Sequence, residues 1–123
     1  MNLTKNDKES LEYDLSIVKE ASEDLVYLKE ISGLFITNAG EMLRNLDKAM
    51  SVSDWVTVQN IAHKLSSNFY LFGLKEGGKA LLKIEINLLK KENYNELPDL
   101  FVIAKTQGEK AIMQLEKDFH DHN

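Results

Sequence analysis

Apolar residues recur every three or four positions along most of this chain, which is the pattern of amphipathic α-helices. The sequence has no sustained alternation of apolar and polar residues and no Asn-Gly or Asp-Gly turn, so strands are not expected. Ser22 is the predicted N-cap of a long helix, with Glu23 and Asp24 in the first turn. The inward positions of this helix are Leu25, Leu28, Ile31, Phe35, Ala39, Met42, Leu46 and Ala49.

Three further helices follow. The second is predicted to begin after Ser53 and to end at Gly73, with Trp55, Val58, Ala62, Leu65, Phe69 and Phe72 inward. The third is predicted from about Leu74 through Lys91, with Leu81, Leu82, Ile84, Leu88 and Leu89 inward. The pair Gly77 and Gly78 near its start is explained equally by close packing and by a loose first turn. Pro98 suits the first turn of the last helix, which continues through Phe101, Ala104, Ala111, Leu115 and Phe119.

Four helices joined by short loops predict an all-α fold, an antiparallel up-down-up-down four-helix bundle. A short extra N-terminal helix is predicted over Leu15–Ala21, with Asp14 as its cap. Residues 1–12 are interpreted as a flexible lead and residues 13–120 as one bundle domain. The initiator Met1 and the short polar ends favour a free-standing protein over an excised domain.

Composition narrows the function classes. The chain has 123 residues, no cysteine and a net charge of −5. Disulfides and thiolate metal sites are therefore excluded, and the charge is opposite in sign to that of a typical nucleic-acid binder. The apolar runs are too short to span a membrane. We expect a cytoplasmic protein that neither binds nucleic acid nor inserts into a membrane. The terminal His120 and His122 are interpreted as part of a polar end, and no metal site is expected.

The stretch "NIAHKLSSNFYLFGL" holds the only histidine of the first 119 residues, His63. At about 100° per residue, this side chain points roughly 120° away from the centre of the apolar stripe. No acidic residue lies one turn away on the same helix, so the ring is predicted to be solvated and without a carboxylate partner. An exposed imidazole is a nucleophile in its neutral form, and this form is well populated at neutral pH. A ring sealed inside the bundle, or locked against a carboxylate, would overturn this interpretation.

The segment "AHKLSSNFYLFGL" resembles the signature of the histidine-containing phosphotransfer (HPt) domain family: a phosphorylated His, Leu two residues later and Gly ten residues later. Further similarities are the upstream "YDLS", the "DW" that starts the His helix, and the downstream "GLKEGGKALLKIE". The lysine that the family usually carries three residues after the His is Ser66 here, and Lys83 or Lys79 on the next helix is the candidate replacement. The resemblance covers residues 13–119.

The resemblance implies a role for each residue around the ring. His63 is the phosphorylated nucleophile and Gly73 is the motif glycine. Gln59, Ser66, Ser67 and Lys83 are the expected neighbours of the phosphoryl group, and the amide and hydroxyl groups among them can donate hydrogen bonds to it. Asn60, Lys64 and Tyr70 are the expected docking residues.

The resemblance also implies a mechanism. The chain would act as a monomer without kinase or nucleotide-binding activity and without a cofactor of its own. A receiver domain of a response regulator or a hybrid sensor histidine kinase would supply the phosphoryl group from an aspartate, together with Mg²⁺, and a second receiver would accept it. The alternative is a helical-bundle adaptor that binds partners without chemistry. A metal-binding bundle is a third class, and its ligand spacing is missing from the sequence.

Overall fold

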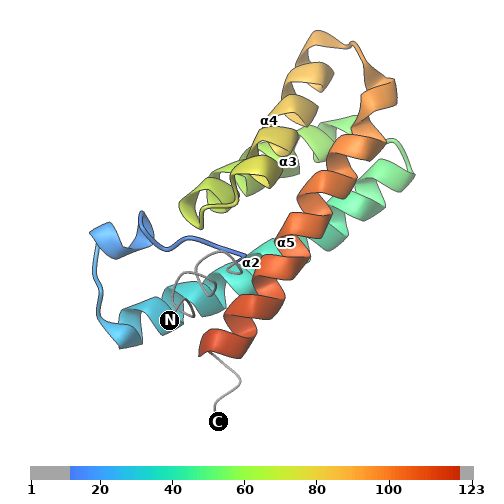
Figure 1. Ribbon diagram of the computed structural model, residues 1–123. Helices are drawn as coiled ribbons and strands as arrows, with labels where there is room; N and C mark the ends of the chain where they lie inside the picture. Colours follow the sequence, from blue (N-terminus) through green and yellow to red (C-terminus); the bar gives the residue numbers. More distant parts are fainter. Residues whose placement is uncertain (1–11, 120–123) are drawn as a thin grey trace, which may run out of the picture.

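The computed structural model describes residues 12–119, and this part of the chain is helical without any strand. The elements, in chain order, are η1 (Val18–Glu20), α2 (Leu25–Ser51), α3 (Trp55–Leu71), α4 (Lys75–Lys90), η2 (Tyr94–Glu96) and α5 (Leu97–Phe119) (Figure 1). The all-α class and the four long helices predicted from the apolar periodicity are confirmed. The helices within residues 12–119 include none that is both long and apolar enough to cross a bilayer.

The predicted ends of the helices are close to the observed ones, but two predicted caps are wrong. Helix α2 begins after Asp24, and the hydroxyl of Ser22 accepts a hydrogen bond from the Asp24 N–H instead of capping the helix. Helix α3 begins after Asp54, whose carboxylate accepts hydrogen bonds from the backbone N–H and the hydroxyl of Thr57. Aspartate and serine are equally good N-caps, so sequence preference alone does not choose between neighbours.

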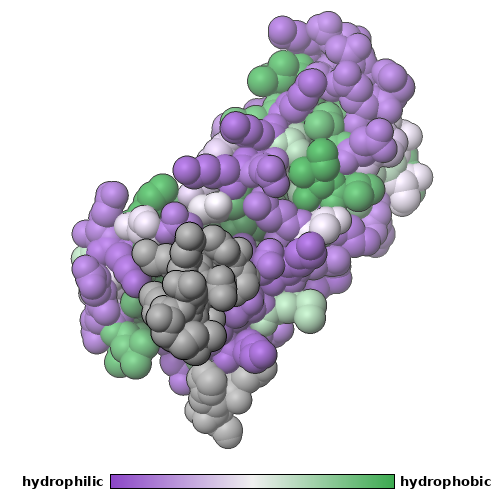
Figure 2. Space-filling model, viewed as in Figure 1, coloured by the Kyte–Doolittle hydropathy of each residue, from purple (hydrophilic) through white to green (hydrophobic). Residues whose placement is uncertain are grey.

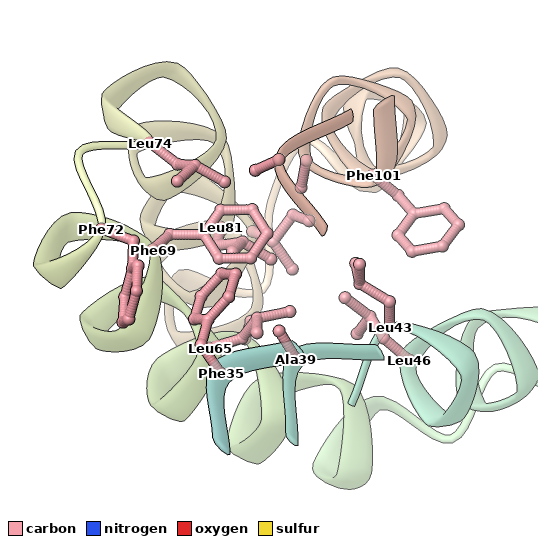
Figure 3. Packing of buried hydrophobic residues seen from close by; sticks show 14 of the residues in the cluster. Phe35, Ala39, Leu43, Leu46, Leu65, Phe69, Phe72, Leu74, Leu81 and Phe101 are labelled. Atoms are coloured by element: carbon pink, nitrogen blue, oxygen red, sulfur yellow. The ribbon is translucent and has the colours of Figure 1, made fainter. Parts of the chain in front are cut away.

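The core is formed where α2 contacts α3, α3 contacts α4, α4 contacts α5, and α5 contacts α2. Phe35 of α2 stacks on Phe72 with ring centroids 4.3 Å apart, and it lies 6.3 Å from the ring of Phe69 (Figure 3). Most predicted inward positions are buried. Leu25 and Leu89 are exceptions, with 68% and 60% exposure, because one begins α2 at the end of the bundle and the other lies about 100° around α4 from the buried Leu88.

The glycine pair at the start of α4 is explained by close packing. A Cβ atom on Gly77 would lie 2.7 Å from the ring of Phe69, and one on Gly78 would lie 2.9 Å from the ring of Tyr70. The Gly77 N–H, in the first turn of α4, donates a hydrogen bond of 2.5 Å to the side-chain oxygen of Gln107 on α5. Two neighbouring helices therefore fix the first turn of α4, which excludes a loose start.

The segment of residues 12–16, called the N-terminal strap, packs across the turn between α3 and α4. The Asp14 N–H donates to the Phe72 carbonyl at 2.8 Å, and the Tyr13 hydroxyl donates to Asp118 of α5 at 2.5 Å. Burial, together with that hydrogen bond, raises the pKa of Tyr13. Only η1 represents the short helix predicted over Leu15–Ala21, and most of the predicted flexible lead, residues 1–11, lies outside the described residues.

We predict opposite stability changes for two glycine-to-alanine variants. Gly73 has φ of +77°, and a Cβ atom there would overlap the side chain and backbone of Asp14, so Gly73→Ala should lower the free energy of unfolding by about 2 kcal/mol or more. Gly40 lies inside α2, where a Cβ atom would make ordinary contacts. Gly40→Ala should therefore raise stability by up to about 1 kcal/mol. Urea unfolding followed by circular dichroism measures both, and a Gly73→Ala protein as stable as the wild type would contradict the role of the strap.

Candidate functional site

His63 lies in the middle of α3, and its side chain is 67% exposed. The neighbouring Ala62 and Leu65 are fully buried in the core, so the helix turns the imidazole towards the solvent. The prediction of a water-facing ring is confirmed. The ring is mounted on a helix that packs on both α2 and α4, which limits the movement of its backbone.

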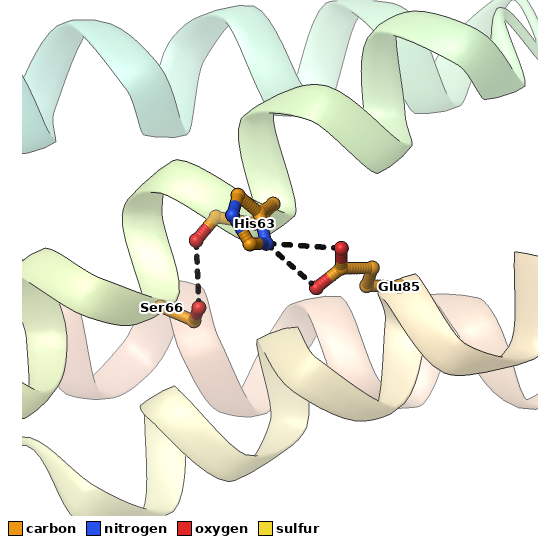
Figure 4. A network of polar contacts seen from close by, with 3 residues as sticks. All are labelled: His63, Ser66 and Glu85. Carbon is orange, nitrogen blue, oxygen red and sulfur yellow. Dashed lines mark hydrogen bonds and ion pairs between the residues drawn. The ribbon is translucent and has the colours of Figure 1, made fainter. Parts of the chain in front are cut away.

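The prediction that the ring has no carboxylate partner is wrong, and this contact is one of the two arrangements that count against a free, unpaired imidazole. The side chain is still 67% exposed and the contact involves Nδ1 alone, so the interpretation of His63 as a nucleophile holds only for the other ring nitrogen, Nε2. Nδ1 of His63 lies 3.1 Å from Oε1 and 3.0 Å from Oε2 of Glu85, which reaches it from α4 (Figure 4). Glu85 is largely shielded, with 17% of its side chain exposed. The helical neighbours of His63 in the sequence could not show this contact, because Glu85 belongs to a different helix.

The contact with Glu85 determines which ring nitrogen is available. An ionised carboxylate only accepts hydrogen bonds, so Nδ1 of the neutral ring must carry the proton and donate it. The lone pair of the neutral imidazole is then on Nε2, on the other side of the ring from the carboxylate. Among the described residues, the polar contacts of the ring involve Nδ1 alone. The arrangement therefore presents one oriented nucleophilic nitrogen to the solvent.

Two of the predicted phosphoryl neighbours lie elsewhere. Ser66 is buried, and its hydroxyl donates a hydrogen bond of 2.8 Å to the His63 carbonyl, so this hydroxyl is not directed at the ring (Figure 4). Lys83 lies roughly 160° around α4 from Glu85, and its ammonium group is 3.8 Å from Glu96. Lys79 lines the same hollow as Lys83. Neither lysine replaces the one that the HPt pattern carries at the position of Ser66.

The other predicted residues surround His63 on α3. Asn60, Lys64 and Ser67 are exposed, and Gln59 and Tyr70 are half-buried. Val56, two turns before the ring, is 72% exposed and was not among the predicted docking residues. The sequence alone could have suggested Val56 as a docking residue, because it lies seven residues before His63 and therefore on the same face of the helix.

Gly73 follows the C-cap of α3, as predicted, and its N–H donates to the Tyr70 carbonyl at 3.1 Å. It therefore ends the helix that carries His63 and contacts the N-terminal strap. Gly73 therefore has a structural role, because it lies about three helical turns from the ring of His63. Among residues 12–119, no group of three or more His, Asp or Glu side chains is arranged to hold a metal ion, and His120 and His122 lie outside the described residues.

Comparisons with protein-family models, with curated proteins and with solved structures find no match for this chain. The resemblance to the HPt family therefore stays a prediction based on the residues around His63, and the geometry of the site has to support any function by itself.

We predict that Glu85 determines the tautomer of His63. In the wild type, nitrogen NMR of the neutral ring should show the proton on Nδ1. Glu85→Gln should preserve this tautomer because its side-chain oxygen still accepts a hydrogen bond, whereas Glu85→Leu should shift the proton towards Nε2. Glu96→Leu is the control, because Glu96 contacts Lys83 and not His63. An unchanged tautomer in Glu85→Leu would show that the contact does not orient the ring.

Proposed function

We propose that this protein is a phosphotransfer intermediate of a two-component phosphorelay, in which His63 accepts a phosphoryl group from a receiver-domain aspartate and passes it to another receiver. The observation that carries the proposal is the imidazole of His63, which is 67% exposed and contacts Glu85 through Nδ1, while Nε2 makes no polar contact with the described residues. The resemblance of the sequence around His63 to the HPt signature supports the same function.

The chemistry uses the lone pair of Nε2. As the Nε2–P bond forms, the bond between phosphorus and the aspartyl oxygen breaks, and the aspartate leaves as a carboxylate without needing a proton. The ring keeps its proton on Nδ1 and becomes positively charged. Phosphoryl transfer depends mainly on positioning and on charge stabilisation, and the receiver contributes Mg²⁺ and its acidic pocket. Reversal of the same step on a second receiver returns the neutral ring.

Glu85 acts as a positioning residue for this reaction. Its carboxylate accepts the Nδ1–H bond, so it holds the ring with Nε2 outwards and stabilises the positive charge that the ring acquires on phosphorylation. A Ser-His-Glu hydrolase would require a serine hydroxyl on the other ring nitrogen. The nearest candidate in sequence, Ser66, donates to a backbone carbonyl instead, which favours direct phosphorylation of the ring.

The proposed docking surface for receivers is the solvent face of α3 around His63. It comprises Asn60, Lys64 and Tyr70 from the sequence prediction, with Val56 as an additional exposed apolar contact. A small surface of this kind is typical of transient complexes. The partners that we propose are receiver domains and a hybrid sensor histidine kinase, and we propose that the protein works as a cytoplasmic monomer without catalytic activity of its own.

We also propose the up-down-up-down order of the four helices. The short connections at residues 52–54, 72–74 and 91–96, the last of which contains η2, support this order, because short loops join neighbouring helices that run in opposite directions. The contact between α2 and α5 would close the bundle. This order gives the docking surface a rigid support on both sides of α3.

We predict that His63→Gln abolishes phosphorylation. The full-length protein, incubated with a phosphorylated receiver and Mg²⁺, should acquire phosphate that is labile in acid and stable in base. The His63→Gln protein should acquire none while keeping its helical circular dichroism. A His120→Gln, His122→Gln double variant should be labelled like the wild type and serves as the matched control. Labelling that survives in His63→Gln would contradict the proposal. An adaptor would bind receivers but would not be labelled in any variant.

We predict that Glu85→Leu slows phosphotransfer about tenfold without abolishing it. The lost hydrogen bond to a charged ring is worth about 1.5–3 kcal/mol when shielded, and the partial exposure of His63 places the effect at the lower end. Glu85→Gln should slow the reaction less, because it keeps the ring orientation and loses only the charge. Rapid-quench kinetics should give phosphotransfer rates that decrease from the wild type to Glu85→Gln and then to Glu85→Leu. Equal rates in all three proteins would show that Glu85 has no part in the mechanism.

A further inference from the structure

Helix α4 carries three lysines, here called the lysine row, on a face that the phosphotransfer chemistry does not use. Lys79, Lys83 and Lys90 line a hollow of about 490 Å³ together with the apolar side chains of Leu82 and Ile86. Ile86 is 45% exposed and lies between Lys83 and Lys90. Figure 2 shows the side of the molecule on which α4 and α5 lie, where hydrophilic residues cover most of the surface and apolar groups form small patches.

Helix stability explains only part of the lysine row. Lys90 lies in the last turn of α4, where the helix dipole favours positive charge. Lys79 and Lys83 are four residues apart, a spacing at which like charges destabilise a helix. Only one ion pair within 4.0 Å involves the row in the described part of the chain, between Lys83 and Glu96 at 3.8 Å. Glu92 also lines the hollow, so two carboxylates, Glu92 and Glu96, lie beside the three lysines. The surface that remains is still net positive, on a chain of net charge −5.

The row is separated from the imidazole site. At about 100° per residue, Lys79, Lys83, Ile86 and Lys90 fall within an arc of roughly 60° on α4. Glu85, which contacts His63, lies on average about 130° away from that arc. A ligand on the lysine row would leave Nε2 of His63 accessible, so the row is a second surface and not an extension of the first.

We propose that the lysine row binds an acidic peptide segment of a partner protein, with carboxylates on the lysines and one apolar side chain on Ile86. Charge complementarity selects an anionic ligand. The hollow is also lined by Glu92 and Asn93, whose side-chain oxygens can accept hydrogen bonds from the backbone N–H groups of a peptide.

A membrane surface fits the row less well. Helices that lie on membranes present a continuous apolar face below their lysines. The arc of α4 that holds the lysine row carries one exposed apolar side chain, Ile86, and the exposed Leu89 lies about 60° further round the helix. The distance from Lys79 to Lys90 is about 17 Å along the helix axis, which an extended peptide of about five residues covers. The row therefore matches a short acidic segment with one central apolar residue.

Fluorescence anisotropy tests the proposal with a labelled short peptide of Asp and Glu residues around one central Leu. The full-length protein should bind it, and added salt should weaken the binding because surface charges are screened. The triple variant Lys79→Gln, Lys83→Gln, Lys90→Gln should weaken binding about tenfold or more. The control Lys29→Gln, Lys48→Gln, Lys110→Gln changes the net charge equally and should weaken binding less than about twofold.

Two further variants make the test specific. Ile86→Ser should remove the preference for the Leu peptide over the same peptide with Ser at its centre. His63→Gln should bind the Leu peptide like the wild type, which separates this site from the phosphotransfer site. The proposal is overturned by equal losses in the two triple variants, by the absence of peptide binding, or by tighter binding of single-stranded DNA or of phosphatidylserine vesicles than of the peptide.

Discussion

The close contact between α3 and α4 is the constraint on which the site depends. The rings of Phe69 and Tyr70 lie against Gly77 and Gly78, at a distance that leaves no space for Cβ atoms on α4. Because the two helices approach so closely there, the next turns are also within reach of each other, and Glu85 meets Nδ1 of His63 at 3.0–3.1 Å. A larger separation would leave an exposed histidine whose ring turns freely and whose proton is not held on Nδ1.

The rest of the bundle maintains this contact. The Gln107 side chain holds the Gly77 N–H from α5, and the strap holds the turn at Gly73 through the backbone of Asp14. Phe35 of α2 stacks on Phe72 at the end of α3. These interactions involve different elements, yet all of them converge on the junction of α3 and α4. The proposed chemistry involves two residues, His63 and Glu85, and the packing of the other helices and of the strap fixes their positions.

The sequence predicted the features that depend on one helix at a time. Helical periodicity placed the inward stripes and turned His63 outwards, because the direction of a side chain follows from its position in its own helix. The contact of Glu85 with His63 depends on the register between two helices, which no periodicity encodes. The same limit explains Ser66, whose position suggested a phosphoryl neighbour. Its hydroxyl instead donates to the backbone of its own helix, an alternative that is open to any serine there.

The charges around Nε2 bear on how long a phosphoryl group would stay there. A phosphoryl group on Nε2 would add about two negative charges across the ring from the carboxylate of Glu85, and no lysine takes the place that Ser66 occupies. The positive ring therefore provides the main compensation within the protein, and solvent surrounds the rest of the group. Weak compensation raises the energy of the phosphorylated form relative to one in which lysines surround the group. Under the proposed function, a site with these charges would pass a phosphoryl group on and would store it poorly.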